Sequence, residues 1–452
     1  KAVAERALAF GMDVVFAPRP PAHREVAAEE LGDLAGRVRQ VRWEELVEAA
    51  DVLSLHVPLT DDTHHLVDAD VIAKMKDDAV LVNTARGPVV DEAALVTALR
   101  EGRLFGAGLD VYEDEPALAP GLAELGLGRL VLDGSSSLFQ QLVHAEIARV
   151  DLSLSALVGI HNELNLGMIA GLGSERQKAT WQGRLESFDA LGAFCLTEPD
   201  HGSDIAGGLA TTATRDGDEW VIRGAKRWIG AGTIADVALV WARDTADGEI
   251  KGFVVPTDTP GYEATKIEHK TAVKIVQNAD ITFTDVRIPA ENKLEKANTF
   301  ADTNVILLGS RNGLGWQAVG AQQGILDAAR RYALERTQFG RPIAGHQLVQ
   351  SLLVQIAANL AATLGMAHRA VQLEAAGEVS MTQASLVKLK TSQMCRESAA
   401  LGRQMMGGNG ILADVGLGRF FCDVEAIFTY EGTYEVNSLI VGRGLTGHSA
   451  FL

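Results

Sequence analysis

Two segments of this sequence combine residue types that can carry out chemistry. Arg86 lies in the segment NTARG, and Glu115 follows it in the acidic run YEDEP. A guanidinium can grip a carboxylate through two parallel hydrogen bonds, which explains Arg rather than Lys at such a place. Glu431 lies in YEGT, where a carboxylate could remove a weakly acidic C–H proton if burial raised its pKa. A lone Glu-Gly pair is more often a surface turn, so the flanking sequence has to decide.

The composition limits the kinds of partner. Lys and Arg number 41 against 59 Asp and Glu, which gives a formal net charge of −18. Nucleic acids and anionic membranes both bind basic surfaces, so we expect neither as a partner. The three cysteines, Cys195, Cys395 and Cys422, are far apart in the sequence. This spacing predicts reduced thiols, with neither a disulfide framework nor a metal site.

The apolar runs and the first residues of the chain predict how it relates to membranes and whether its N-terminus is truncated. No apolar run is long enough to predict a membrane-spanning helix, and no charged-then-apolar leader is present. We therefore expect no membrane insertion and a cytoplasmic location. The chain starts at Lys1 inside a helical pattern rather than at Met, which predicts a truncated N-terminus. Its 452 residues are enough for two or three domains.

Residues 1–133 alternate short helical and strand patterns. Strands are expected at 13–17, 52–56, 79–82 and 104–109, and helices at 2–10, 43–49, 71–75 and 92–100. Such alternation predicts βαβ units and a parallel, doubly wound sheet. We therefore expect a partial, Rossmann-like α/β fragment in this part of the chain.

The pattern changes after residue 133. Residues 134–191 are helical in character, and residues 192–292 form short strands between turns such as DGDE and DTPG, which predicts an antiparallel β-domain. Residues 293–452 are helical, with two long helices that lack internal Pro expected at 348–373 and 384–406. A loop-like seam, DGSSS, lies near 132–137.

The first part of the chain resembles the nucleotide-binding domain of the D-2-hydroxyacid dehydrogenase family. The resemblance covers most of residues 1–132 and is carried by DVLSLHVPLT at 51–60 and by the segment from VNTARG to LDVYEDEP at 82–116. It implies that Arg86 matches the Arg that holds the substrate carboxylate. It also implies that Glu115 matches the Glu that orients a catalytic His.

This resemblance is incomplete at both ends. The family's glycine-rich phosphate turn is expected just before residue 1, and the chain begins after it. The family's Pro-His step is expected after Leu132, where the sequence is Asp133-Gly134-Ser135. We therefore expect a vestigial site in which NAD(P) binding is not retained.

The rest of the chain, residues 138–452, resembles the acyl-CoA dehydrogenase family and in particular its glutaryl-CoA dehydrogenase-like branch. The matching segments are LTEPDHGSD at 196–204, RTQFG at 336–340, QMMGGNG at 404–410 and FTYEGTYEVNSLIVGR at 428–443. The resemblance implies a truncated α-helical domain, a middle β-domain and a C-terminal four-helix bundle. It also implies FAD as cofactor and α,β-desaturation of a short or medium acyl-CoA thioester, in which Glu431 takes the α-proton and flavin N5 accepts the hydride.

The resemblance assigns further site residues position by position. It places Arg311, Tyr430 and Gly432 at the substrate. It places the following residues at the cofactor: Leu196, Thr197, Ser203, Trp228, Gly230, Arg336, Gln338, Phe339, Gln404, Gly407, Gly408, Thr433 and Glu435. The RTQFG residues match positions that reach the ADP part of a flavin in a neighbouring subunit, which implies a homo-oligomer, a dimer or a tetramer. The expected electron acceptor is an electron-transfer flavoprotein.

Some positions depart from the family pattern. Ser155 and Gly159 stand where glutaryl-specific members carry an Arg and a Ser, so no cation awaits a second carboxylate. Gly230 replaces a Thr that often donates to flavin N5, and Ser310 leaves the alternative base position without a carboxylate. Loss of the donor at Gly230 should alter the flavin potential or its reactivity with oxygen, which keeps acyl-CoA oxidase activity open as an alternative. Acyl-CoA oxidase and glutaryl-CoA dehydrogenase activities are the less expected variants.

Two other interpretations remain open from the sequence. In one, the chain is a remnant of an NAD(P)-dependent D-2-hydroxyacid dehydrogenase or glyoxylate/hydroxypyruvate reductase, with residues 138–452 as a passenger. In the other, it is a catalytically impaired fusion or an assembly artefact.

Overall fold

The computed structural model describes residues 1–9, 12–18, 24–109, 111–114, 119–120, 137–412 and 416–450. The chain divides into two compact units, Lys1–Leu127 and Gly128–Leu452. Glu115 and residues 132–136 of the expected seam lie outside the described residues.

The first unit is an α/β unit built on parallel strands, which confirms the expected fold class. Strands β3, β4 and β5 form a three-stranded parallel sheet, and β1 pairs with β2 in a separate parallel pair. The sheet positions Leu53, Leu55 and Leu81 are at most 3% exposed, because helices cover these apolar runs. The elements are α1 (Ala2–Ala9), β1 (Val15–Phe16), α2 (Ala28–Leu31), β2 (Arg39–Gln40), α3 (Trp43–Ala49), β3 (Val52–Leu55), α4 (Ala69–Ile72), β4 (Val80–Asn83), α5 (Glu92–Arg100) and β5 (Gly106–Leu109).

The second unit begins with helices. They are α6 (Ser137–Val150), α7 (Leu152–Gly159), a π-helical segment η4 (Ile160–Leu166), α8 (Gly167–Leu172) and α9 (Glu175–Glu186). Each of the residues from α7 through α8 continues the same helical path, so η4 is a register change inside one longer helix. Helix α9 starts with a capping box in which Ser174 and Gln177 satisfy each other's backbone N–H groups.

The middle part is a seven-stranded sheet in the order β10-β9-β7-β8-β12-β11, with β6 paired to β9. Most neighbours are antiparallel, whereas β6 and β7 run parallel to β9. The indole N–H of Trp241 on β9 donates to Thr303 on helix α11 over 2.7 Å, which ties the sheet to that helix. The elements are β6 (Gly192–Cys195), α10 (Ile205–Gly208), β7 (Thr212–Asp216), β8 (Glu219–Ile229), β9 (Val237–Asp244), β10 (Ile250–Pro256), β11 (Tyr262–Lys266) and β12 (Ala279–Pro289).

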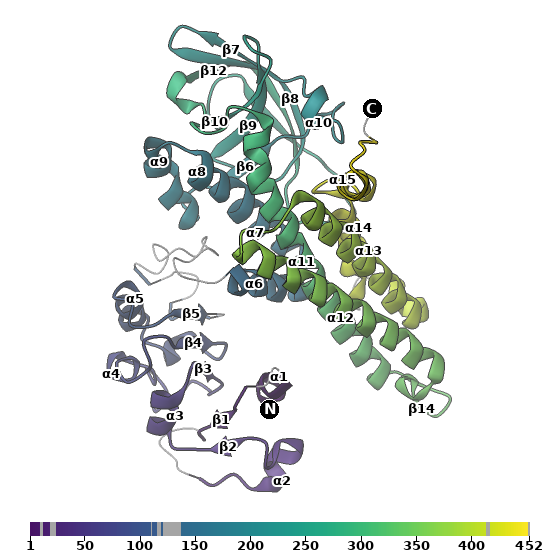
Figure 1. Cartoon of the computed structure of the whole chain (residues 1–452). Coiled ribbons are helices and arrows are strands. Elements are labelled where there is room, and N and C mark those ends of the chain that lie inside the picture. The colour runs from purple at the N-terminus through teal and green to yellow at the C-terminus, as the bar shows by residue number, and fades with distance from the viewer. Residues whose placement is uncertain are drawn as a thin grey trace. The chain divides into compact units, whose positions relative to one another are not determined.

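The last part is a helical bundle in which α11, α12 and α13 run side by side (Figure 1). Helix α11 spans 36 residues and carries a buried apolar face that includes Leu314, Ala318 and Ile325. A helical C-terminal part agrees with the fold that the family resemblance implies, and α12 and α13 correspond to the two long helices expected at 348–373 and 384–406. Its elements are α11 (Phe300–Glu335), β13 (Thr337–Gln338), β14 (Arg341–Pro342), α12 (Gln347–Ala375), α13 (Met381–Met405), α14 (Leu417–Thr429) and α15 (Tyr434–Thr446).

One expectation about the apolar runs was wrong. Among the described residues, one helix, α12, is long and apolar enough by length and composition to cross a membrane. Only 11% of its apolar window is buried, and Leu348 and Val354 are 82% and 66% exposed. The sequence analysis expected this helix at 348–373 but not an apolar stretch of spanning length, because scattered Gln, Ser and Asn residues interrupt the apolar run. An apolar surface of this kind on a bundle helix needs a covering partner.

Helix α6 packs closely on α11 because a glycine makes room. A Cβ atom at Gly320 would overlap the backbone carbonyl of Ala145. We predict that Gly320→Ala lowers the free energy of unfolding by about 1–3 kcal/mol, because the two helix backbones must separate. The control, Gly183→Ala in α9, meets nothing within 4 Å and should raise stability by up to about 1 kcal/mol. Urea unfolding of both variants checks this, and equal effects would refute the packing argument.

Candidate active site

Glu431 lies in the short loop between α14 and α15, in a backbone conformation that few residues adopt. Its φ is 57°, and Gly432 follows with a φ of 81°. A left-handed conformation at a non-glycine residue costs free energy and persists only where neighbours enforce it. Here the side-chain amide of Asn437 donates to the carbonyls of Glu431, Gly432 and Thr433 at 3.2, 2.8 and 3.0 Å.

A buried lysine fixes the same loop from the other side. The ammonium of Lys388 on α13 donates to the carbonyl of Gly432 over 2.6 Å and to that of Phe428 over 3.0 Å. Burial lowers the pKa of Lys388 to about 8, against the opposing influence of Glu431. Lys388 therefore holds the backbone of the loop and supplies positive charge near its carboxylate.

The carboxyl group of Glu431 is held in an environment that makes it a stronger base. Burial raises its pKa above the usual range, and the charge of Arg311, the hydrogen bond from Ser310 and the charge of Lys388 offset part of that increase. The Ser310 hydroxyl donates to Oε2 of Glu431 over 3.0 Å. A carboxylate with a raised pKa is matched to proton abstraction near neutral pH.

Two of the expected substrate residues lie in this region. Burial lowers the pKa of Arg311, and Glu431 opposes that effect. One Arg311 Nη donates to the carbonyl of Leu307 and to the Met381 sulfur, whereas its Nε is buried with no partner among the described residues. The Tyr430 hydroxyl donates to the side chain of Gln317 over 2.9 Å, which anchors the residue before the base.

A buried ion pair that the sequence analysis missed contacts the LTEPDHGSD segment and holds its backbone. Lys226 on β8 lies 2.8 Å from Glu198 and also donates to the carbonyl of Leu196 over 3.0 Å. Glu198 accepts hydrogen bonds from the backbone N–H groups of Ala210 and Thr211 at 2.7 and 2.9 Å. Burial lowers the pKa of Lys226 to about 8. Glu198 is evident in the TEP motif, but its partner Lys226 lies 28 residues further along the chain, so the sequence alone does not pair them.

Trp228 and Gly230 lie at the end of β8, as expected for a surface that meets a planar ligand. Trp228 has a φ of 63° and is 52% exposed, and the Arg227 guanidinium carbon lies 5.4 Å from the indole centre. A Cβ at Gly230 would come within 2.8 Å of the Ile160 side chain on η4. Ile160 thus occupies the space that the Thr of related sequences would use.

A second group of expected cofactor residues gathers beyond the C-terminal end of α11. Arg336, Gln338 and Phe339 line a hollow of about 1020 Å³ together with Gly407 and Gly408. Phe339 is 93% exposed. Gln404, Thr433 and Glu435 are not among the residues that line this hollow. Of these, Thr433 caps α15 by accepting from the Val436 N–H over 3.2 Å.

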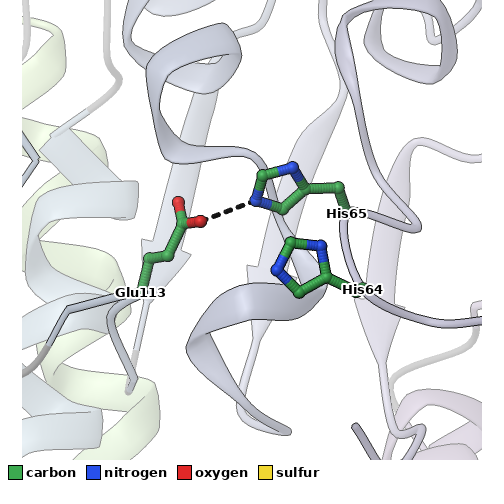
Figure 2. Close-up of side chains that lie close together, drawn as sticks. All are labelled: His64, His65 and Glu113. Carbon is green, nitrogen blue, oxygen red and sulfur yellow. Dashed lines mark hydrogen bonds and ion pairs between the residues drawn. The ribbon is translucent and has the colours of Figure 1, made fainter. Parts of the chain in front are cut away.

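The first unit contains a different cluster of chemically active side chains. His65 Nε2 lies 2.6 Å from Glu113 Oε1, and the rings of His64 and His65 lie with their centres 4.1 Å apart and their planes tilted by 32° (Figure 2). The three side chains place potential metal ligands within 4.8 Å of one another. The hydrogen bond already uses one ligand atom each of His65 and Glu113. Arg86 is separate from it and donates to the carbonyl of Ala85 over 2.6 Å.

Four family models match successive parts of the chain. The acyl-CoA dehydrogenase N-terminal, middle and C-terminal domains match residues 112–189, 193–286 and 300–446. The NAD binding domain of D-isomer specific 2-hydroxyacid dehydrogenase matches residues 1–126. The larger unit is therefore that of a flavin-dependent dehydrogenase.

Curated relatives agree with this class. An acryloyl-CoA reductase (NADH) of Anaerotignum propionicum is 33% identical over 334 residues, which cover 71% of this chain and 84% of that relative. The human mitochondrial short-chain specific acyl-CoA dehydrogenase is 33% identical over 332 residues, with coverage of 71% and 80%. The chain belongs to the acyl-CoA dehydrogenase family.

Solved structures show the same fold. Glutaryl-CoA dehydrogenase of Mycobacterium smegmatis has a TM-score of 0.70 at 38% identity, and covers 73% of this chain and 86% of its own. A glutaryl-CoA dehydrogenase structure from the same organism, in complex with FADH2, gives 0.70 at 34% identity, with the same coverage. A structure described as the electron transferring flavoprotein of Acidaminococcus fermentans gives 0.69 at 29% identity, covering 72% and 88%.

The hydrogen bond from Ser310 stabilises the charged form of Glu431. We predict that Ser310→Ala moves the acidic limb of the pH profile of kcat/KM upward by about one unit, because the carboxylate loses a donor. The active form is the carboxylate, so activity falls as the pH drops through its raised pKa. Ser392→Ala is the control, since its hydroxyl donates only to Leu389 on its own helix. An unchanged limb in Ser310→Ala would contradict the assignment.

The buried pair of Lys226 and Glu198 can be tested separately. We predict that Glu198→Gln costs about 3–5 kcal/mol in the free energy of unfolding and weakens flavin retention, because a buried ammonium loses its counter-charge. The control, Glu219→Gln, breaks an exposed pair with Arg287 on the same sheet and should cost at most about 1 kcal/mol. Urea unfolding and the flavin-to-protein absorbance ratio measure both effects. Similar costs for the two variants would refute the proposed support.

Proposed function

We propose that this protein is an FAD-dependent acyl-CoA dehydrogenase that desaturates a short or medium acyl-CoA thioester between its α- and β-carbons. The observation that carries the proposal is the Glu431 carboxyl group, which burial makes more basic and which Ser310 and Arg311 hold in place. Desaturation requires a base to remove the proton beside the thioester carbonyl. Membership of the acyl-CoA dehydrogenase family supplies the substrate class.

In this proposal the loop does more than hold the base. The strained backbone at Glu431 directs its N–H group for use as a donor to the thioester oxygen, where charge develops as the α-proton leaves. Gly432 lacks a side chain, so the thioester can approach the loop backbone closely. Arg311, beside Glu431, supplies positive charge for the anionic CoA thioester, and Tyr430 is fixed by Gln317 as part of the wall.

The described residues fit FAD. Trp228 is an exposed aromatic side chain suited to stack on a planar ring system, and Leu196, Thr197 and Ser203 lie in the loop that the pair of Lys226 and Glu198 supports. At the hollow beyond α11, a Cβ at Gly407 or Gly408 would meet nothing within 4 Å. When bound, the flavin supplies the hydride acceptor for the β-carbon.

The two groups of cofactor residues favour a homo-oligomer. Ser310 lies in the first third of α11 and Arg336 directly follows the helix, so at 1.5 Å per residue they are roughly 40 Å apart. That distance exceeds the length of one FAD, so the hollow with Arg336, Gln338 and Phe339 would serve the FAD of another copy. The exposed apolar side chains of α12, such as Leu348 and Val354, give such a copy a surface to cover. A dimer or a tetramer meets both requirements.

The proposal extends to partners and to the first unit. An electron-transfer flavoprotein is the proposed acceptor, supported by the similarity to the structure described under that name. We place the protein in the cytoplasm, in line with the bacterial relative.

Hydroxyacid oxidation is not proposed for residues 1–133, because Asp133-Gly134-Ser135 supplies no acid/base His. The division at 133, 191 and 292 is part of the same proposal.

Replacing the base separates chemistry from cofactor binding. We predict that Glu431→Gln lowers kcat with butyryl-CoA by about 10²–10⁴-fold or more while the flavin stays bound, because an amide cannot take the α-proton. Anaerobic bleaching of the flavin absorbance measures the rate. Glu378→Gln, an exposed residue after α12, is the control and should keep the parent rate. Normal bleaching by Glu431→Gln would show that another residue is the base.

A further inference from the structure

A second carboxyl group, that of Glu163, packs against α11 at Gly313, about one turn beyond Ser310, and has no role in the mechanism above. Glu163 is in η4, the π-helical turn between α7 and α8. The side-chain amide of Asn165 donates to the carbonyl of Ile160 in the same turn over 3.0 Å. π-Helical turns inside α-helices change the direction of the side chains they carry and are frequent at functional sites.

The structure makes room for this carboxyl group at the interface with α11. A Cβ at Gly313 on α11 would overlap the Glu163 carboxyl group, and a Cβ at Gly159 would lie 3.9 Å from it. Its Oε1 is buried and accepts no hydrogen bond from the part of the chain that the structure describes. The nearest cation-forming group is His144, whose Nε2 lies 3.4 Å from Oε1. The Glu163 side chain is still 20% exposed, so part of it faces open space rather than protein.

The pKa of the Glu163 carboxyl group depends on its burial and on the charges of Glu431 and Glu374. Burial raises the pKa of Glu163 well above its usual range, and the charges of Glu431 and Glu374 raise it further. His144 does not neutralise it, because burial lowers the pKa of that imidazole to about 4. Glu374 differs from Glu163 in having a donor, the amide of Asn312 at 3.3 Å. Among the described residues, Oε1 of Glu163 thus has no hydrogen-bond donor.

We propose that Glu163 is a specificity-determining residue, which selects acyl-CoA substrates whose acyl chain carries a hydroxyl group beyond the two reacting carbons. This inference rests on the proposed function and names its substrate class more narrowly. An unsubstituted alkyl chain would cover the carboxyl group and leave it without a partner. An unmade hydrogen bond of this kind is costly, and a site built to bind a hydroxyl group rejects the analogue without it.

The choice of a hydroxyl group follows from hydrogen-bonding capacity. A hydroxyl group can donate to a carboxylate and can accept from a carboxylic acid, so it pairs with Glu163 in either protonation state. A terminal carboxylate can pair only with the protonated form and brings a like charge near Glu431. The absence of a cation at Ser155 and Gly159 acts against that carboxylate as well. A hydroxylated chain therefore meets fewer penalties than a dicarboxylic one.

The experiment compares matched substrates on the purified, flavin-bound full chain. Butyryl-, valeryl- and hexanoyl-CoA are each paired with the CoA thioester that carries a terminal hydroxyl group, and kcat/KM is measured by flavin bleaching. We expect the parent protein to favour at least one hydroxylated member by roughly tenfold or more, the factor of one unpaired polar group. Glu163→Leu should reverse that preference, and Glu163→Gln, which still pairs with a hydroxyl group, should keep it. Glu374→Gln is the matched control and should leave the ratio unchanged.

A second readout does not depend on turnover. Calorimetry gives the Kd of each trans-2-enoyl-CoA product and of its hydroxylated counterpart for the parent and for Glu163→Leu. A Kd ratio that changes roughly tenfold with Glu163 supports the inference even if no substrate bleaches the flavin, an outcome that would reject the proposed function alone. Ratios of kcat/KM and Kd that are the same in the parent, Glu163→Leu and Glu374→Gln overturn the assignment of Glu163. A preference for glutaryl-CoA in the parent would overturn it too.

Discussion

The clamp of Lys388 and Asn437 on the loop from Phe428 to Gly432 is the interaction on which the candidate site depends. Both clamp residues are completely buried, and together they satisfy the loop carbonyls while Glu431 stays in a left-handed backbone conformation. Their hydrogen bonds offset the strain of a left-handed conformation at a non-glycine residue. The position of the base is therefore set by α13 and α15, not by the loop itself.

Helix α11 links this clamp to the other parts of the site. On α11, Ser310 donates a hydrogen bond to Glu431, and Arg311 adds positive charge near that carboxyl group. Thr303, seven residues before Ser310, accepts a hydrogen bond from the indole N–H of Trp241 in the β-sheet. The far end of α11 leads into the hollow around Phe339. One rigid helix thus fixes the base, the sheet that carries Trp228 and the distal hollow on a common frame. This explains why small residues such as Gly313 and Gly320 recur along it, where neighbouring groups approach its backbone.

The sequence predicted the fold and part of the site well. The helices at 43–49 and 92–100 are confirmed to the residue, since local periodicity and Asp91 as an N-cap determine their ends. The loop of Glu431 was also evident from its motif, and the role of this residue remains a prediction. The hydrogen bond from Ser310, the clamp by Lys388 and the partner of Glu198 were not predictable. Each joins residues 28 or more positions apart, and only the tertiary packing brings them together.

The π-helical turn η4 is another feature that could not be predicted from the sequence. A regular α-helix continued from Ser155 would place Glu163 on the face that a 3.6-residue period gives. The wider turn of η4 instead rotates every later side chain around the helix axis. Two carboxyl groups, those of Glu163 and Glu431, then lie in one buried region with different donors. Ser310 and Arg311 favour the ionised form of Glu431, and Glu163 receives no hydrogen bond. Their environments separate a base from a neighbouring polar group, so that proton abstraction and recognition of the acyl chain can be assigned to different residues.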